Sequence, residues 1–239
     1  MNRRTLTVLM IFSLFLGLAP GLIPPPAAAA PVASPESIPM AATTSTQCFY
    51  PTADTFIYNQ QPSTNFGGAP TLEVSSIGDA GFYDIRQSFL RFDLSAIPDD
   101  ALVLGADLEL YLTSAPNGGA GELRAAEDIW TEYGLTWNNR PSYGSFLYDE
   151  ISWGVNSTGW QTWEADQLVN EWVSGSRVNR GLSIIDRGVA TPRSVFHSRE
   201  GSSTRQTKLC VEWSTSLTTN IVVDAIEVTQ AVQDLNNSV

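Results

Sequence analysis

Basic residues other than arginine are almost absent from this chain of 239 residues, which has one lysine, Lys208, and one histidine, His197. Its 13 basic and 25 acidic residues give a formal net charge of −12. Nucleic-acid binding needs clustered lysine and arginine side chains to neutralise phosphates, so this composition argues against a nucleic-acid partner. One histidine and two cysteines also cannot supply the four ligands of a usual zinc site.

Charged residues of both signs are scarce, at 16% of the chain, whereas 43% of the residues are hydrophobic. This balance is not that of a disordered protein, because the chain has enough apolar surface to bury a substantial core. Glycine and proline are frequent, with 18 and 14 residues, and both favour turns. The composition is typical of an all-β extracellular domain rather than a helical cytosolic one.

The first 30 residues have the three parts of a signal peptide. Arg3 and Arg4 form a basic start, and the uncharged run Leu6–Leu18 follows. That run is shorter than a membrane-spanning helix needs. Ala27–Ala30 supplies small residues for cleavage. We therefore expect a secreted or cell-surface protein whose mature form has no transmembrane span.

Two segments are predicted to be linkers. Residues 31–46 are rich in proline, alanine, serine and threonine, which is typical of a flexible connection. Residues 215–239 begin with a polar stretch and then resume a strand-like alternation at Ile221. We interpret this end as a second linker and the start of a truncated further module in a larger surface protein. A disordered tail is the alternative.

Residues 47–214 carry frequent strand patterns separated by turn residues. The clearest is Ala106–Leu112, where apolar residues alternate with Asp107, Glu109 and Tyr111, as in a strand with one buried face. One segment, Asp166–Ser174, has helical spacing instead, with Asp166 as the expected N-cap and Gly175 as the stop. The pattern predicts an all-β jelly-roll β-sandwich with one short helix. The other predicted strands are Thr55–Tyr58, Thr71–Ser76, Ser88–Leu94, Leu182–Ile185, Val195–His197 and Leu209–Trp213.

The two cysteines lie at opposite ends of this domain. Cys48 precedes the first predicted strand, and Cys210 lies in the last. In an exported protein such a pair is expected to form a disulfide, here joining the first and last strands. The alternative is two buried free thiols.

Several motifs occur in order along the domain: PTADTFI at 51–57, RQSFLRFDLSAIP at 86–98, LTWNNRP at 135–141 and FHSRE at 196–200. Together they resemble the DNRLRE-type domain, which is similar to carbohydrate-binding module family 96. The resemblance implies a β-sandwich in secreted multidomain bacterial proteins, without catalysis of its own. It also implies binding of polysaccharide, including acidic glycans such as alginate. The chain departs from the family pattern at 205–208, where a proline is usual before the last strand.

Basic residues are concentrated near the end of the domain. Residues 48–176 contain 4 basic and 18 acidic residues, whereas residues 177–208 contain 7 basic and 2 acidic residues. Arginine binds carboxylates through two hydrogen bonds, so Arg193, Arg199 and Arg205 are candidate ligands for an acidic glycan. The alternative is that these arginines pair with acids of the same domain.

Aromatic rings suggest a second mode of sugar binding, because exposed rings stack on sugar faces. An irregular Gly/Ser-rich stretch contains five of them, and from these we select Trp153 and Tyr143 as candidate binding residues. The alternative is that the rings belong to the core or the sandwich edge. The five rings are Tyr143, Phe146, Tyr148, Trp153 and Trp160.

Two further questions concern metal and catalysis. Jelly-roll modules often hold a structural calcium ion, for which Asp54 and the Asp99–Asp100 turn are candidate ligands, although the EF-hand spacing is missing.

Among the acids, Glu132 is the least implausible catalytic residue, and the simpler interpretation is a hydrogen-bonded loop carboxylate. No acid is spaced from His197 as a catalytic triad requires. We therefore predict no enzymatic activity. A structural or adhesive spacer without glycan binding is the alternative function.

Overall fold

The computed structural model describes residues 43–79, 82–186 and 190–215. The predicted signal peptide, most of the first linker and residues 216–239 lie outside this part. Among the described residues, no helix is long and apolar enough to cross a membrane.

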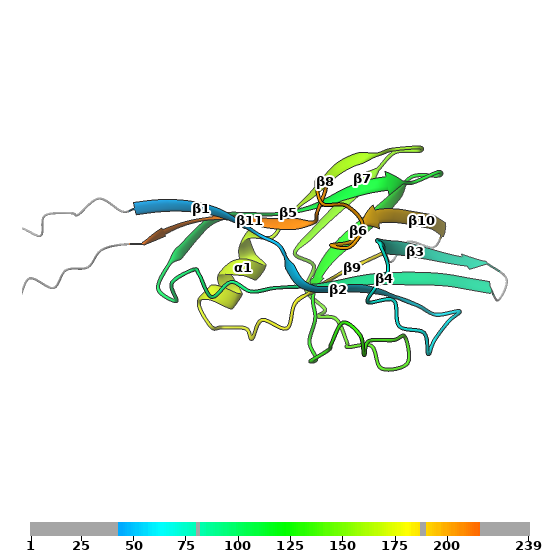
Figure 1. Ribbon diagram of the computed structural model, residues 1–239, viewed down its shortest axis with the longest axis horizontal. Helices are drawn as coiled ribbons and strands as arrows, with labels where there is room; N and C mark the ends of the chain where they lie inside the picture. Colours follow the sequence, from blue (N-terminus) through cyan, green and yellow to red (C-terminus); the bar gives the residue numbers. More distant parts are fainter. Residues whose placement is uncertain (1–42, 80–81, 187–189, 216–239) are drawn as a thin grey trace, which may run out of the picture. The chain divides into compact units, whose positions relative to one another are not determined.

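The described part of the chain is built from antiparallel strands and one short helix (Figure 1). The predicted all-β fold is therefore confirmed, and the curled antiparallel sheet is consistent with a jelly-roll β-sandwich. In chain order the elements are β1 (Thr43–Phe49), β2 (Pro51–Tyr58), β3 (Thr71–Asp79), β4 (Phe82–Phe92), β5 (Leu102–Ser114), β6 (Gly119–Ala125), β7 (Asp149–Trp153), β8 (Gly159–Glu164), α1 (Asp166–Val173), β9 (Leu182–Ile185), β10 (Ala190–His197) and β11 (Lys208–Thr215).

The strand order is β1-β11-β5-β10-β3-β4-β9-β6-β7, with β2 paired to β4 and β8 paired to β5. The central β5 is long enough to pair with β11 along its first half and with β10 at its end, while β8 lies along its other edge. Segments far apart in the sequence thereby become neighbours, and β5, β8, β10 and β11 share one outward face.

The core is formed by the inward residues of these strands. Leu108, Leu110 and Leu112 of β5 are fully buried. Leu108 lies opposite Trp163 of β8, and Leu112 lies opposite Phe196 of β10. Their period of two is the alternation predicted from the sequence. Glu109 and Tyr111, between them, are therefore left on the outward face.

The ends of the domain are joined covalently, because Cys48 and Cys210 form a disulfide between β1 and β11. The predicted bridge between the first and last strands is thus confirmed.

The first strand begins earlier than expected, since Thr43 pairs with Thr215. The predicted linker 31–46 therefore extends too far, because its last four residues form hydrogen-bonded strand.

The predicted helix is confirmed as α1, which lies against β5 (Figure 1). Leu168, Val169 and Trp172 form its buried face. Gly175 follows it with a φ of +71°, as the predicted stop requires. The expected N-cap is wrong by one position, because Ala165 occupies it. Asp166 instead accepts a hydrogen bond from the Ala106 amide of β5 at 2.5 Å, which links helix and sheet.

Glycine is required at position 181, immediately before β9. Its φ is +88°, and a Cβ atom there would clash with the Leu90 carbonyl oxygen. We expect Gly181→Ala to lower the free energy of unfolding by about 3 kcal/mol, since backbone strain and overpacking add. Gly175→Ala is the matched control: its φ is also positive but its Cβ would meet nothing, so about 1 kcal/mol is expected. Urea unfolding measures both, and equal losses would contradict the clash.

Candidate functional site

Three carboxylates from distant parts of the sequence meet beside β2. Asp54 comes from β2, Glu132 from the loop before β7, and Glu200 from the turn after β10. One oxygen from each lies within 4.8 Å of the others. Asp54 and Glu132 are buried, with 1% and 7% of their surface exposed, whereas Glu200 is exposed. We call these three residues the acidic cluster.

Arg199 lies beside the acidic cluster and forms ion pairs with two of its members. Its Nη2 lies 2.8 Å from Glu132 Oε2, and its Nε lies 2.7 Å from Glu200 Oε1. Its backbone amide donates to Asp54 Oδ2 at 2.9 Å, and the Asp54 amide donates to Glu132 Oε1 at 3.2 Å. One guanidinium thus faces three carboxylates, which leaves the cluster with two uncompensated negative charges when all three are ionised.

Asp54 has the most unfavourable setting of the three. Its Oδ1 is buried and accepts no hydrogen bond from any residue that the structure describes. The pKa of Asp54 is raised from 3.8 to about 7, mainly by burial and also by the charges of Glu200 and Glu132, and this value includes the lowering effect of the Arg199 amide and charge. This site therefore favours either a proton or a cation beside Asp54. Because Asp54 and Glu132 are buried, a polymer chain has no direct access to them as catalytic acids.

A different group of side chains lies on the outward face of β5, β8, β10 and β11. Tyr111 contacts the Trp160 ring edge-on, with 5.4 Å between centroids, and stacks on His197 at 5.8 Å. Trp160 is 41% exposed. The rings come together because Tyr111 and Trp160 are directly opposed in the β5–β8 register. We call Tyr111, Trp160, His197, Arg205 and Lys208 the Trp160 platform.

Two cations complete the Trp160 platform. The Arg205 guanidinium lies 4.3 Å above the Tyr111 ring, and Lys208 Nζ lies 5.2 Å above the Trp160 ring. Lys208 also pairs with Glu109 at 3.0 Å. Arg205 makes no ion pair within the described ranges 43–79, 82–186 and 190–215, so its charge is open to a ligand. Burial lowers the pKa of His197, and Arg205 lowers it further, so this imidazole favours the neutral form.

The three arginines selected from the sequence have three different environments. Arg205 belongs to the Trp160 platform, and Arg199 is held in the acidic cluster. Arg193 is half exposed and lies 3.7 Å from Glu73. Among the described residues, each therefore has different partners: Glu73 for Arg193, Glu132 and Glu200 for Arg199, and the Tyr111 ring for Arg205. The alternative of pairing within the domain holds for Arg199 and Arg193, while Arg187 lies outside the described residues.

The two selected aromatic residues also differ from expectation. Trp153 is only 7% exposed, contacts Trp163 and Phe196, and donates a hydrogen bond to Ser194 at 2.8 Å. The prediction of an exposed stacking ring at Trp153 is therefore wrong, because its strand β7 turns this side chain into the core. Tyr143 is half-buried and lines a shallow cavity of about 420 Å³ with Arg140, Pro141 and Ser142.

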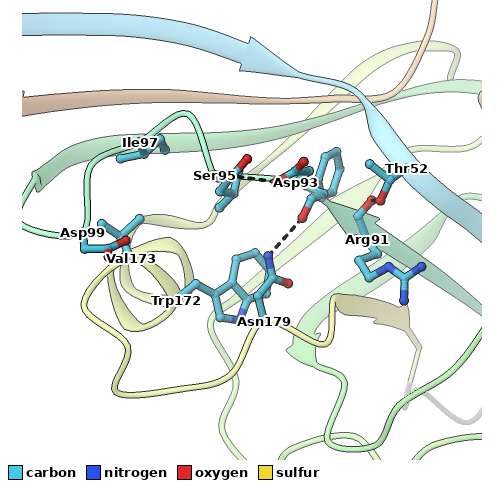
Figure 2. A pocket seen from close by; sticks show the side chains of 11 residues that line it. Thr52, Arg91, Asp93, Ser95, Ile97, Asp99, Trp172, Val173 and Asn179 are labelled. Carbon is cyan, nitrogen blue, oxygen red and sulfur yellow. Dashed lines mark hydrogen bonds between the residues drawn. The ribbon is translucent and has the colours of Figure 1, made fainter.

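A second cavity, of about 410 Å³, lies between α1 and the segment after β4 (Figure 2). Trp172 and Asn179 form one side, and Arg91 and Asp93 the other (Figure 2). Hydrogen bonds from the Ser95 amide and hydroxyl lower the pKa of Asp93. Asp99, one of the proposed calcium ligands, also lines this cavity and is not part of the acidic cluster. Two carboxylates make the cavity unfavourable for an anionic sugar.

Sequence reasoning missed most of this arrangement. The cluster partners of Asp54 are 78 and 146 residues away along the chain, so no spacing connects them. Trp160 had a detectable signal, because Trp160 and Trp163 are three residues apart in one strand and must face opposite sides. One of the two rings therefore had to point outward.

Two comparisons with known proteins bear on these sites. Residues 45–212 match carbohydrate-binding module family 96. The chain is also 24% identical over 180 residues to a gellan lyase of Bacillus sp. That alignment covers 74% of this chain but spans only 7% of the relative's length. The shared region therefore corresponds to a small part of the larger protein.

Proposed function

The chain belongs to carbohydrate-binding module family 96, and from this premise we propose that it is a secreted, non-catalytic module that binds an acidic polysaccharide on the Trp160 platform. The observation that carries this proposal is that the exposed Trp160 indole and the Arg205 guanidinium both contact Tyr111, and that this guanidinium has no ion pair among the described residues. An indole stacks on the apolar face of a sugar ring, and a guanidinium binds a uronate carboxylate through two hydrogen bonds.

The platform is also held in place before a ligand arrives. Its rings are fixed by strand pairing and by mutual contacts, so little conformational entropy is lost on binding. The outward face of a sheet suits a long polymer better than a deep cavity would. The small share of the gellan lyase that the chain spans supports a module attached to a larger protein.

The indole is tested by Trp160→Ala. We expect about a tenfold loss of affinity for uronic-acid oligosaccharides, since one stacked ring is lost, with little change in Tm because the ring is exposed. Tyr83→Ala is the matched control, as Tyr83 is 55% exposed on β4 outside the platform. Isothermal titration calorimetry measures the affinity. Unchanged binding by Trp160→Ala would contradict the platform.

The charge argument is tested by Arg205→Gln and Lys208→Gln. We expect the larger loss of affinity for Arg205→Gln, because Lys208 must exchange Glu109 for the ligand carboxylate. The Arg205→Gln variant should also show a weaker dependence of affinity on salt. Arg140→Gln is the matched control, since Arg140 lies 4.1 Å above the Trp137 ring beside Tyr143.

The outcomes separate the candidate functions. If Arg140→Gln abolishes binding and Arg205→Gln does not, the cavity beside Tyr143 is the site. If neutral and acidic oligosaccharides bind equally, the acidic specificity is wrong. If no glycan shows saturable binding at physiological salt, the alternative of a structural or adhesive spacer holds.

A further inference from the structure

The acidic cluster and the Trp160 platform are connected by one short segment of chain. Residues 198–207 run from the end of β10 to the start of β11. The first part of this segment contributes Arg199 and Glu200 to the cluster. Its last part contributes Arg205 to the platform, and Lys208 follows directly.

This segment is anchored at both ends. At the cluster end, Ser198 donates a hydrogen bond to the Ala69 carbonyl at 2.7 Å, and the Arg199 guanidinium donates to the Thr52 carbonyl at 3.1 Å. At the platform end, the fully buried Thr207 donates to the His197 carbonyl at 3.2 Å. Between these anchors, the Arg205 amide donates to Ser202 at 3.2 Å, and the Gln206 side chain donates to the Arg199 carbonyl at 3.5 Å. The cluster can therefore influence the position of Arg205 through residue 199 and Gln206.

The cluster itself is incomplete as an ion-pair network. Three carboxylates face one guanidinium, which leaves two negative charges at short range. Asp54 Oδ1 is buried with no hydrogen-bond donor in the described part of the chain, although buried carboxylate oxygens normally have one. The other two carboxylates keep free lone pairs beside their bonds to Arg199. A missing divalent positive charge would account for both features.

We propose that Asp54, Glu132 and Glu200 bind one calcium-like divalent cation, and that this cation fixes residues 198–207 so that Arg205 is presented at the platform. Calcium fits this set better than magnesium does. It accepts six to eight oxygens in flexible geometry, so three carboxylates can be supplemented by water, whereas magnesium demands near-ideal octahedral ligands. The second half of the proposal rests on the proposed glycan site, while the first half does not.

The cation site is tested on the protein alone. We expect calcium added to chelator-treated protein to raise Tm by roughly 5 °C or more at saturation, and titration calorimetry to give a stoichiometry of one. Glu200→Gln should abolish the increase and still fold, because Glu200 is exposed. Asp54→Asn should also abolish it, and its amide oxygen can still accept the Arg199 N–H. Glu150→Gln, an exposed acid on β7, is the control.

The coupling is tested with short uronic-acid oligosaccharides, which do not form calcium gels. We expect chelation to weaken their binding at least fivefold in the wild type and to have no effect on Glu200→Gln, which binds weakly under both conditions. Trp160→Ala should bind the glycan about tenfold more weakly and keep its calcium-induced Tm shift, which separates failure of the platform from failure of the cation site. No calcium-induced shift and no heat of binding would overturn the site. A calcium shift with chelator-insensitive glycan binding would overturn the coupling.

Discussion

Replacing both Cys48 and Cys210 by serine is expected to lower the free energy of unfolding by about 5 kcal/mol. The two cysteines are 162 residues apart, so the bridge closes almost the whole domain into one loop. In the chain-entropy model, stabilisation by a disulfide increases with loop length through restriction of the unfolded chain. Such a loss is comparable to the whole stability of many domains.

Urea unfolding of oxidised protein, reduced protein and the double serine variant measures this effect. The reduced wild type and the double variant should agree, because the loss arises in the unfolded chain rather than in packing at the two side chains. The m value should increase in both, since an unfolded chain without the cross-link exposes more surface. The double variant itself should be insensitive to reductant. An unchanged midpoint in both reduced samples would contradict the prediction.

Asp54 is expected to make the free energy of unfolding depend strongly on pH when a chelator is present. The pKa of Asp54 is about 7 in the folded protein and 3.8 in the unfolded chain. Between these values the folded state retains a proton that the unfolded state has released, so stability falls as pH rises. Asp54 is therefore expected to cost about 4 kcal/mol at pH 8 relative to pH 4.

The comparison with Asp54→Asn isolates this contribution from those of the other acids. Asparagine keeps the shape and the acceptor for the Arg199 amide but carries no charge. The stability difference between wild type and variant should therefore grow in favour of the variant from pH 4 to pH 7 and level off above it. Urea unfolding at several pH values measures it. A stability difference that does not change with pH would show that the pKa of Asp54 is the same in the folded and unfolded states, which would contradict the prediction.

The secondary structure of the domain was largely predictable where one face of an element is buried. Ala106–Leu112 and Asp166–Ser174 were identified because burial imposes periods of 2 and 3.6 on the apolar residues. The prediction was least accurate at β7 and β8, in a stretch rich in glycine and serine. There Trp153, selected as an exposed ring, is buried, whereas Trp160 is exposed, since local sequence does not say which face of a short strand meets the core.

The candidate sites were predictable only in part, because their residues come from distant segments. Asp54 was identified as a candidate metal ligand together with the Asp99–Asp100 turn, and neither Glu132 nor Glu200 was. Arg205 was identified from charge density along the chain, which also selected Arg193 and Arg199. Charge density does not reveal which arginine already has a carboxylate partner, and that distinction decides which one can bind a ligand.

The sequence by itself determined the all-β fold with one helix, the disulfide and the resemblance to a carbohydrate-binding family. These follow from local periodicity, from having only two cysteines, and from motifs contiguous along the chain. Only the tertiary structure decided which side chains meet. The pairing of β5 with β8 and β11 brings Trp160 and Tyr111 beside Lys208, and the turn after β10 places Glu200 beside Asp54. The physical reason is that strand order and register, which arise from long-range pairing, set these neighbours and leave no signal in local spacing.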